Sequence, residues 1–201
     1  PSKKVVKSEH GVALRKNPTL ACELIEAVAN ATNLPVSVKT RLGWDNGDDL
    51  VEFGVAAQNA GADMICIHAR TYQQPYKVAP KYEQVIAMKQ ALRIPVIGNG
   101  GIESLEDGHN YCKDLDGFYI GQATFGNPWI FTGKKPPLFN DRLPVILNHA
   151  QYLIEHKGEL VGTREIRKHL LAYVKGLHSV KPYKRYLSTV DSFDQIKTLL
   201  L

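Results

Sequence analysis

Glycine turns follow two consecutive apolar segments of the chain. One segment ends in Asn99-Gly100-Gly101, and the next ends in Gly121-Gln122. Glycine leaves its backbone N–H open to a ligand, and N–H groups that precede a helix bind phosphate through hydrogen bonds and the helix dipole. A single glycine pair after a strand is more often only a turn. Two such turns at corresponding places favour a phosphate site.

Two earlier apolar segments also end in polar residues. Lys39 and Arg41 lie at the end of the first segment, and His68 and Arg70 lie at the end of the second. A strand-end lysine can snorkel to water and a single histidine is often a hydrogen-bonded core residue, but a lysine between inward apolar residues requires an anion. Ligands of α/β proteins bind at the carboxyl ends of the strands, so we expect all four ends to share one rim.

The elements that must position this rim are short apolar strands between amphipathic helices. Each strand segment is too short for a helix and lacks strict alternation, as expected for a parallel sheet covered by helices. The expected strands are 35–40, 63–68, 94–99 and 117–121. The expected helices are 18–32, 48–61, 81–92 and 104–115. The resulting αβαβαβαβ order predicts four parallel strands.

The composition changes after Phe131. The stretch 132–144 is polar and rich in proline, and no strand pattern follows it. Three further helices are expected over 143–158, 163–177 and 192–201. We therefore predict a partial barrel domain over 1–133 and a helical domain over 134–201.

Four βα units are half of a closed (β/α)₈ barrel, and a half-barrel has open sheet edges and an uncovered apolar face. The chain has 201 residues and does not begin with Met. Two interpretations stay open at this point. The chain forms an open sheet, or it is the C-terminal portion of a longer protein.

Charge is unevenly distributed. Residues 142–201 carry ten Lys and Arg against five Asp and Glu, whereas residues 1–141 carry fifteen of each. A basic C-terminal part indicates contact with a polyanion, although a solvated helix surface can show the same surplus. The three cysteines match no disulfide or zinc pattern, and no signal peptide or membrane span is visible. We expect a cytoplasmic monomer with reduced thiols, no bound metal and no membrane contact.

Five segments of the chain together resemble the tRNA-dihydrouridine synthase family of the bacterial type. The resemblance implies an FMN-containing (β/α)₈ barrel followed by a helical tRNA-binding domain. NADPH would reduce the flavin, which would pass a hydride to C6 of a tRNA uridine while a cysteine protonates C5. The segments, in order, are PVSVKTRLGWD, IHARTYQQPY, PVIGNGGI, GFYIGQATFGNPWIF and REIRKHLLAYVKGL.

The resemblance also implies residue roles. Flavin contacts would come from Lys39 and His68, and the FMN phosphate would lie against the two glycine turns described above. Arg41 and Arg70 would meet the nucleotide at the substrate mouth. The tRNA backbone would be contacted by the basic residues Arg164, Arg167, Lys168 and Lys175.

Three departures from the family pattern affect these roles. Gly101 stands where the family usually has Asp, and Gln122 stands where it has Arg. The family's catalytic cysteine belongs to a motif upstream of this chain, so Cys22, Cys66 and Cys112 do not match it. We therefore expect no catalytic residue among these 201 and no turnover by the chain alone.

Two other functions remain possible on the sequence. A different FMN barrel acting on a small metabolite would not account for the basic helices. A non-catalytic tRNA-binding module would keep those helices, and Gly101 and Gln122 weakly favour it.

Overall fold

A computed structural model describes residues 2–177 and 180–201. The chain divides into two compact units, of which the first ends at Gly121 and the second begins at Gln122. None of the helices in the described residues has the length and hydropathy that a transmembrane span requires.

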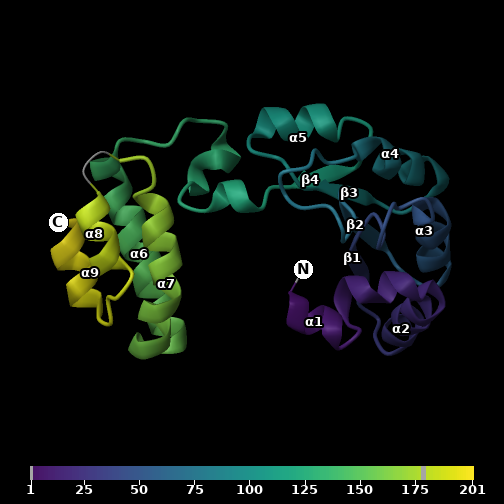
Figure 1. The fold of residues 1–201 in the computed structure, drawn as a ribbon, viewed down its shortest axis with the longest axis horizontal. Coiled ribbons are helices and arrows are strands. Elements are labelled where there is room, and N and C mark those ends of the chain that lie inside the picture. Colours follow the sequence, from purple (N-terminus) through teal and green to yellow (C-terminus); the bar gives the residue numbers. More distant parts are fainter. Residues whose placement is uncertain (1, 178–179) are drawn as a thin grey trace. The chain divides into compact units, whose positions relative to one another are not determined.

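The first unit contains one sheet of four parallel strands in the order β1-β2-β3-β4 (Figure 1). Its strands are β1 (Ser37–Arg41), β2 (Met64–His68), β3 (Val96–Asn99) and β4 (Gly117–Tyr119). Its helices are α1 (Lys3–Lys7), α2 (Pro18–Asn30), α3 (Leu50–Asn59), α4 (Tyr82–Ala91) and α5 (Leu105–Tyr111), with a 3₁₀ helix at Gly11–Lys16. The sequence prediction of an α/β half-barrel is confirmed.

The two faces of the sheet carry different side chains. Ile65 and Ile67 are fully buried and pack toward the helices, together with Val96 of the neighbouring strand. On the opposite face, which would line a barrel, Lys39 pairs in register with Cys66. Parallel strands in register place paired side chains on the same face. The polar strand-end residues therefore share the inner face of the sheet.

One side of the half-barrel stays uncovered, as the strand count predicts. Leu20, Leu24 and Val28 repeat every four residues along α2 and are all exposed. Leu24 and Val28 lie beside β1, which is an edge strand of the sheet. An apolar helix stripe next to an unpaired edge is the surface that a further βα unit of a barrel would cover.

The second unit is helical (Figure 1). It contains α6 (Phe139–Lys157), α7 (Glu159–Tyr173), α8 (Lys181–Leu187) and α9 (Phe193–Leu200), preceded by 3₁₀ helices at Gln122–Thr124 and Pro128–Thr132. Its core is formed by buried aliphatic residues of these helices, including Ile146, Ile166, Leu170, Leu187 and Ile196.

Three details of this unit differ from the sequence expectation. Helix α6 begins at Phe139 and continues through Pro144, because Phe139 packs against the helical core and outweighs the proline. Helix α8, which was not expected, starts with a proline in its first turn and buries Leu187. The unit also begins at Gln122, ahead of residue 134.

The early boundary has a packing cause. The ring of Phe125 lies 5.3 Å from the ring of His169, and Trp129 lies 6.5 Å from Tyr173. Both partners belong to α7, so the segment 122–133 is anchored to the helices.

Candidate functional site

The carboxyl ends of the strands form a polar rung across the sheet. The register aligns Arg41 of β1 with His68 of β2, and His68 with Asn99 of β3. Asn99 is in turn aligned with Tyr119 of β4. The expectation that the strand ends meet at one rim is therefore met for these residues.

Lys39 lies two residues before Arg41 on the same face of β1, and its side chain reaches toward this rung. Its Nζ donates to Oδ1 of Asn99 at 3.3 Å, and Nδ2 of Asn99 donates to the carbonyl of Tyr119 at 2.9 Å. These two bonds fix the orientation of the Asn99 amide. Lys39 is exposed rather than enclosed, since the inner face of the sheet is open. An ammonium group of edge strand β1 therefore lies on the inner face and reaches across it to Asn99 of β3.

The geometry defines the protonation state of His68. Nε2 of His68 lies 3.2 Å from a terminal nitrogen of Arg70. A guanidinium can only donate, so this Nε2 accepts, and the ring is neutral with its proton on Nδ1. Burial, followed by the positive charges of Arg41, Arg70 and Lys39, lowers the pKa of His68 from 6.5 to about 4. His68 thus offers one N–H donor and no charge at neutral pH.

The two arginines of the rim are held by backbone carbonyls. Arg41 donates to the carbonyl of Thr71 at 2.8 Å, and Nε of Arg70 donates to the carbonyl of Val78 at 2.6 Å. Both arginines are buried. Tyr76 is a further residue of the rim, which the sequence analysis did not predict. Its ring lies 5.9 Å from the ring of His68 in an edge-on arrangement and within 6.0 Å of both guanidinium groups. The two arginines therefore place positive charge next to His68 in addition to lining the rim.

The glycine turn after β3 leaves backbone donors free. Gly100 has φ +107° and Gly101 has φ +71°, and neither N–H donates to any acceptor among the described residues. A Cβ on Gly100 would lie 2.9 Å from the ring of His68 and 3.3 Å from Arg70. Tyr82 fixes the turn by donating to the carbonyl of Gly100 at 2.7 Å. Two open amides beside a guanidinium are the chemistry of an anion cradle.

The other expected phosphate contacts fall at the end of the first unit. A Cβ on Gly121 would come no closer than 4.0 Å to Nδ2 of Asn99, so this glycine borders the rim. Gln122 is exposed and is the first residue of the second unit.

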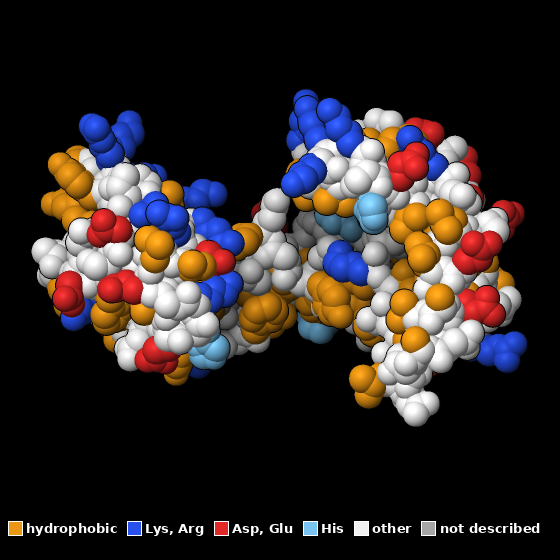
Figure 2. Space-filling model, turned by 90° about the horizontal axis from the view of Figure 1, so that it is seen from below, with side chains coloured by type: hydrophobic (Ala, Val, Ile, Leu, Met, Phe, Trp, Pro, Cys, Tyr) orange, Lys and Arg blue, Asp and Glu red, His pale blue; other side chains and the backbone are white. Residues whose placement is uncertain are grey.

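A cavity of about 380 Å³ opens beside the rim. Lys39, Arg41, His68 and Tyr76 line it from the sheet side, and Val5 of α1 lines it from the other side. Figure 2 shows basic and histidine side chains in a hollow of this unit. The volume suits part of a flat cofactor.

The residues expected to contact tRNA lie in the second unit. Arg164 and Lys168 are exposed on α7, and Lys175 is exposed in the turn that follows. Arg167 is different, because it donates to the carbonyls of Val190 at 2.7 Å and Thr189 at 3.3 Å. Its guanidinium ties α7 to the segment before α9.

None of the three free cysteines occupies the rung. Cys66 is 2% exposed on β2, and burial raises the pKa of its thiol. Cys112 is buried at the end of α5, where burial raises its pKa to about 11. Cys22 belongs to α2. In the described part of the chain, no cluster of His, Cys, Asp and Glu forms a metal site.

Residues 1–200 match the dihydrouridine synthase (Dus) family. The tRNA-dihydrouridine synthase B of Vibrio parahaemolyticus is 35% identical over 96% of this chain and 64% of its own length. A probable tRNA-dihydrouridine synthase 1 of Synechocystis is 34% identical over 100% of the chain and 60% of its length, and a probable tRNA-dihydrouridine synthase of Rickettsia typhi is 32% identical over 92% and 60%. The chain thus spans less than two thirds of these relatives, and it belongs to the dihydrouridine synthase family.

Proposed function

We propose that this chain is the part of a tRNA-dihydrouridine synthase that holds FMN at the rim of its first unit and tRNA on its helical unit. The reaction would reduce uridine in tRNA to 5,6-dihydrouridine. Family membership and the names of the three relatives support this assignment. Another FMN barrel acting on a small metabolite would give no role to the basic helical unit.

The observation that carries the proposal is the joint position of Lys39, His68 and the free amides of Gly100 and Gly101. Within one inner face they supply a cation, a neutral N–H donor and an anion cradle. A flavin mononucleotide needs these three groups, because its ring takes up negative charge on reduction and its tail ends in a phosphate. The residues therefore fit the cofactor.

When bound, FMN supplies hydride chemistry, with NADPH as the source of electrons. Lys39 would hold positive charge where the reduced ring carries negative charge, and Nδ1–H of His68 would hydrogen-bond the ring. Gly100 and Gly101, together with Asn99, Gly121 and Gln122, would bind the phosphate, and Arg41 and Arg70 would meet the nucleotide at the substrate mouth. Gln122 replaces an arginine of the family pattern, so this contact lacks one charge. The target uridine must leave its base stack to reach the rim.

Reduction of the uracil ring requires a hydride at C6 and a proton at C5. Cys66 and Cys112 are buried with raised pKa values, and Cys22 lies on a helix outside the rung. We infer that none of the three donates this proton. A tRNA-modifying reductase with these partners would work in the cytoplasm as a monomer on each tRNA.

The test combines flavin binding with turnover by the purified 201-residue chain. We expect added FMN to bind, Lys39→Met and His68→Gln to weaken that binding, and no dihydrouridine to form from tRNA and NADPH. Glu103→Gln, which alters an exposed carboxylate beyond the glycine turn, serves as a control. Formation of dihydrouridine would contradict the inference about the cysteines.

A second function has one specific observation in its favour. Gly101 and Gln122 both replace charged residues of the family pattern, which weakens the predicted cofactor site. A chain that binds tRNA but does not bind FMN at any tested concentration would be a non-catalytic tRNA-binding module. A gel shift with tRNA, run beside the flavin titration, separates this function from both enzyme functions.

A further inference from the structure

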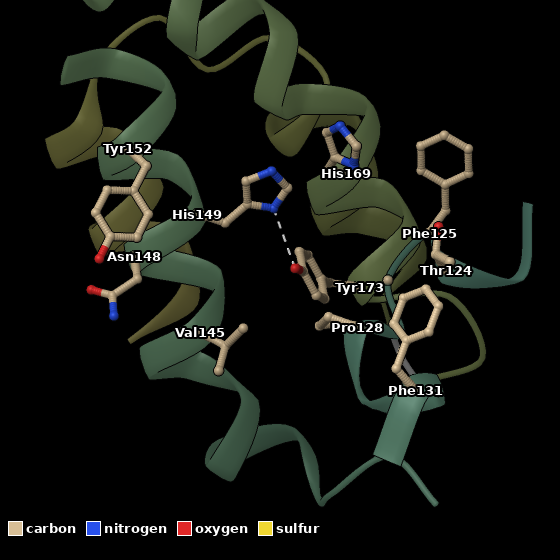
Figure 3. A pocket seen from close by; sticks show the side chains of 11 residues that line it. Thr124, Phe125, Pro128, Phe131, Val145, Asn148, His149, Tyr152, His169 and Tyr173 are labelled. Carbon is tan, nitrogen blue, oxygen red and sulfur yellow. Dashed lines mark hydrogen bonds between the residues drawn. The ribbon is translucent and has the colours of Figure 1, made fainter. Parts of the chain in front are cut away.

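A cavity of about 540 Å³ lies within the helical unit, and none of the residues assigned to the flavin lines it (Figure 3). It is an open cavity lined by residues of α6, α7 and the segment 124–131. On α6 the lining residues recur at the spacing of one helix face, and on α7 they lie one turn apart. The volume is that of a small-molecule site.

The inner wall of this cavity is made of three rings that hold one another in place. His149 approaches the hydroxyl of Tyr173 at 3.3 Å through its Nδ1, as the dashed line in Figure 3 marks. The rings of His149 and His169 are 4.7 Å apart and inclined by 55°. Tyr173 is buried. The wall is therefore preorganised, which lowers the entropic cost of binding a ligand.

The polar atoms of this wall are uncharged. Burial lowers the pKa of both His149 and His169, so both rings are neutral at physiological pH. Among the described residues, His149 bonds only through its Nδ1, and neither the ring of His169 nor the amide of Asn148 makes a hydrogen bond. Neutral imidazoles and a carboxamide offer donors and acceptors to the edge of a neutral ligand.

The outer wall is aromatic and exposed to solvent. Phe125 is 50% exposed, Phe131 is 60% exposed and Tyr152 is 61% exposed. Figure 3 shows the two phenylalanine rings on the side of the cavity opposite α6. Exposed rings around a polar wall are suited to stacking against a flat ligand.

Lysines stand close in the sequence to residues that line the cavity. Lys168 directly precedes His169, and Lys134 and Lys135 follow Phe131 shortly after the aromatic segment. All three lysines are exposed, and Figure 2 shows basic side chains interspersed with hydrophobic ones on this unit. A neutral stacking cavity on a unit that also carries exposed lysines is complementary to a base and to the phosphates of its strand.

We propose that this cavity binds one unpaired nucleobase of the RNA substrate, stacked on Phe125 and Phe131 and hydrogen-bonded by His149 and His169. The proposal deepens the assignment of tRNA as substrate and rests on it. The base held here is a second contact besides the uridine that is reduced, because none of the residues assigned to the flavin lines this cavity. Binding it would fix the register of the RNA on the helical unit.

The first test measures the affinity of the full chain for an unmodified tRNA transcript by fluorescence anisotropy over a range of salt concentrations. The variant carries Phe125→Leu and Phe131→Leu, which keep apolar bulk and remove the stacking faces. We expect binding about 10-fold weaker with an unchanged salt slope, since stacking is lost and phosphate contacts are kept. Tyr183→Leu, at a residue 53% exposed on α8, is the matched control.

A second test asks where the RNA lies. Transcripts containing 4-thiouridine are irradiated on the protein, and cross-linked peptides are identified by mass spectrometry. We expect cross-links at 124–131 and near Tyr152. Tyr152→Leu alters only an exposed ring and provides a further variant if the double substitution lowers the melting temperature.

The outcomes separate this proposal from the assigned substrate. Wild-type affinity in the double variant, with no cross-link at the cavity, would overturn the nucleobase site while leaving tRNA as the substrate. Failure of the wild-type chain to bind tRNA would overturn both proposals.

Discussion

The rim of the sheet and the cavity of the helical unit are built from different kinds of interaction. At the rim, charged side chains are fixed by carbonyls and amides, as Arg41 is by Thr71 and Arg70 by Val78. In the cavity, His149 and Tyr173 are fixed mainly by other rings. The rim suits an anionic cofactor, and the cavity suits a neutral flat group. One chain can thus divide recognition of charge and recognition of shape between two units.

The largest expected effect tests how tightly the glycine turn packs against His68 at the rim. Gly100→Ala places a Cβ against the ring of His68 in a backbone conformation that L residues rarely adopt. We expect the free energy of unfolding to fall by about 2–3 kcal/mol, because strain and overpacking act together. Urea denaturation of the purified chain measures it.

A matched substitution in the other unit isolates the contribution of the contact. Gly158 has φ +78°, and a Cβ at this residue would meet no atom within 4 Å, so Gly158→Ala carries backbone strain alone. Gly158 has ψ 158°, a conformation that is largely restricted to glycine, and we expect a loss of about 1–2 kcal/mol there. Equal losses at both glycines would show that the rim has no tight contact at His68.

An intermediate effect concerns pH. The pKa of His68 is about 4 in the folded chain and near 6.5 when unfolded, so the unfolded chain binds more protons between these values. Stability contributed by His68 is therefore full above pH 6.5 and is lost as the pH falls toward 4. After discounting for solvent screening, we expect about 1–2 kcal/mol.

Chemical denaturation between pH 4 and pH 7 checks this, with His68→Gln as the comparison. The difference in free energy of unfolding between the two proteins should shrink as the pH falls. The remaining histidines and the carboxylates titrate alike in both proteins. A constant difference across this range would mean that burial and the charges of Arg41, Arg70 and Lys39 do not hold His68 neutral.

The smallest effect compares two neighbouring basic residues of α7. Lys168→Ala should lower the salt slope of tRNA binding by roughly 0.7–0.9, the value of one phosphate contact. Arg167→Leu should instead lower stability by about 1–2 kcal/mol, because two carbonyls lose their donor. Lys197, which pairs with Asp194, provides a basic control. A large loss of tRNA affinity in Arg167→Leu with unchanged stability would reverse these assignments.

The strand ends were predictable because their information is local. Apolar segments followed by Lys39, His68 or Asn99 identify both the strands and the residues at their carboxyl ends, and the parallel order brings those ends to one rim. The helical cavity was not predictable in this way. His149 and His169 lie on different helices, and only the packing of α6 against α7 brings their rings together.

The sequence by itself determined the four βα units, the polar rim, the basic helical part and the family. Periodicity and strand-end chemistry are encoded over a few neighbouring residues, so they can be read directly. Only the tertiary structure decided the boundary at Gln122, the start of α6 at Phe139, the structural role of Arg167 and the neutral state of His68. Each of these depends on contacts between residues far apart in the chain, where packing and burial outweigh local preference.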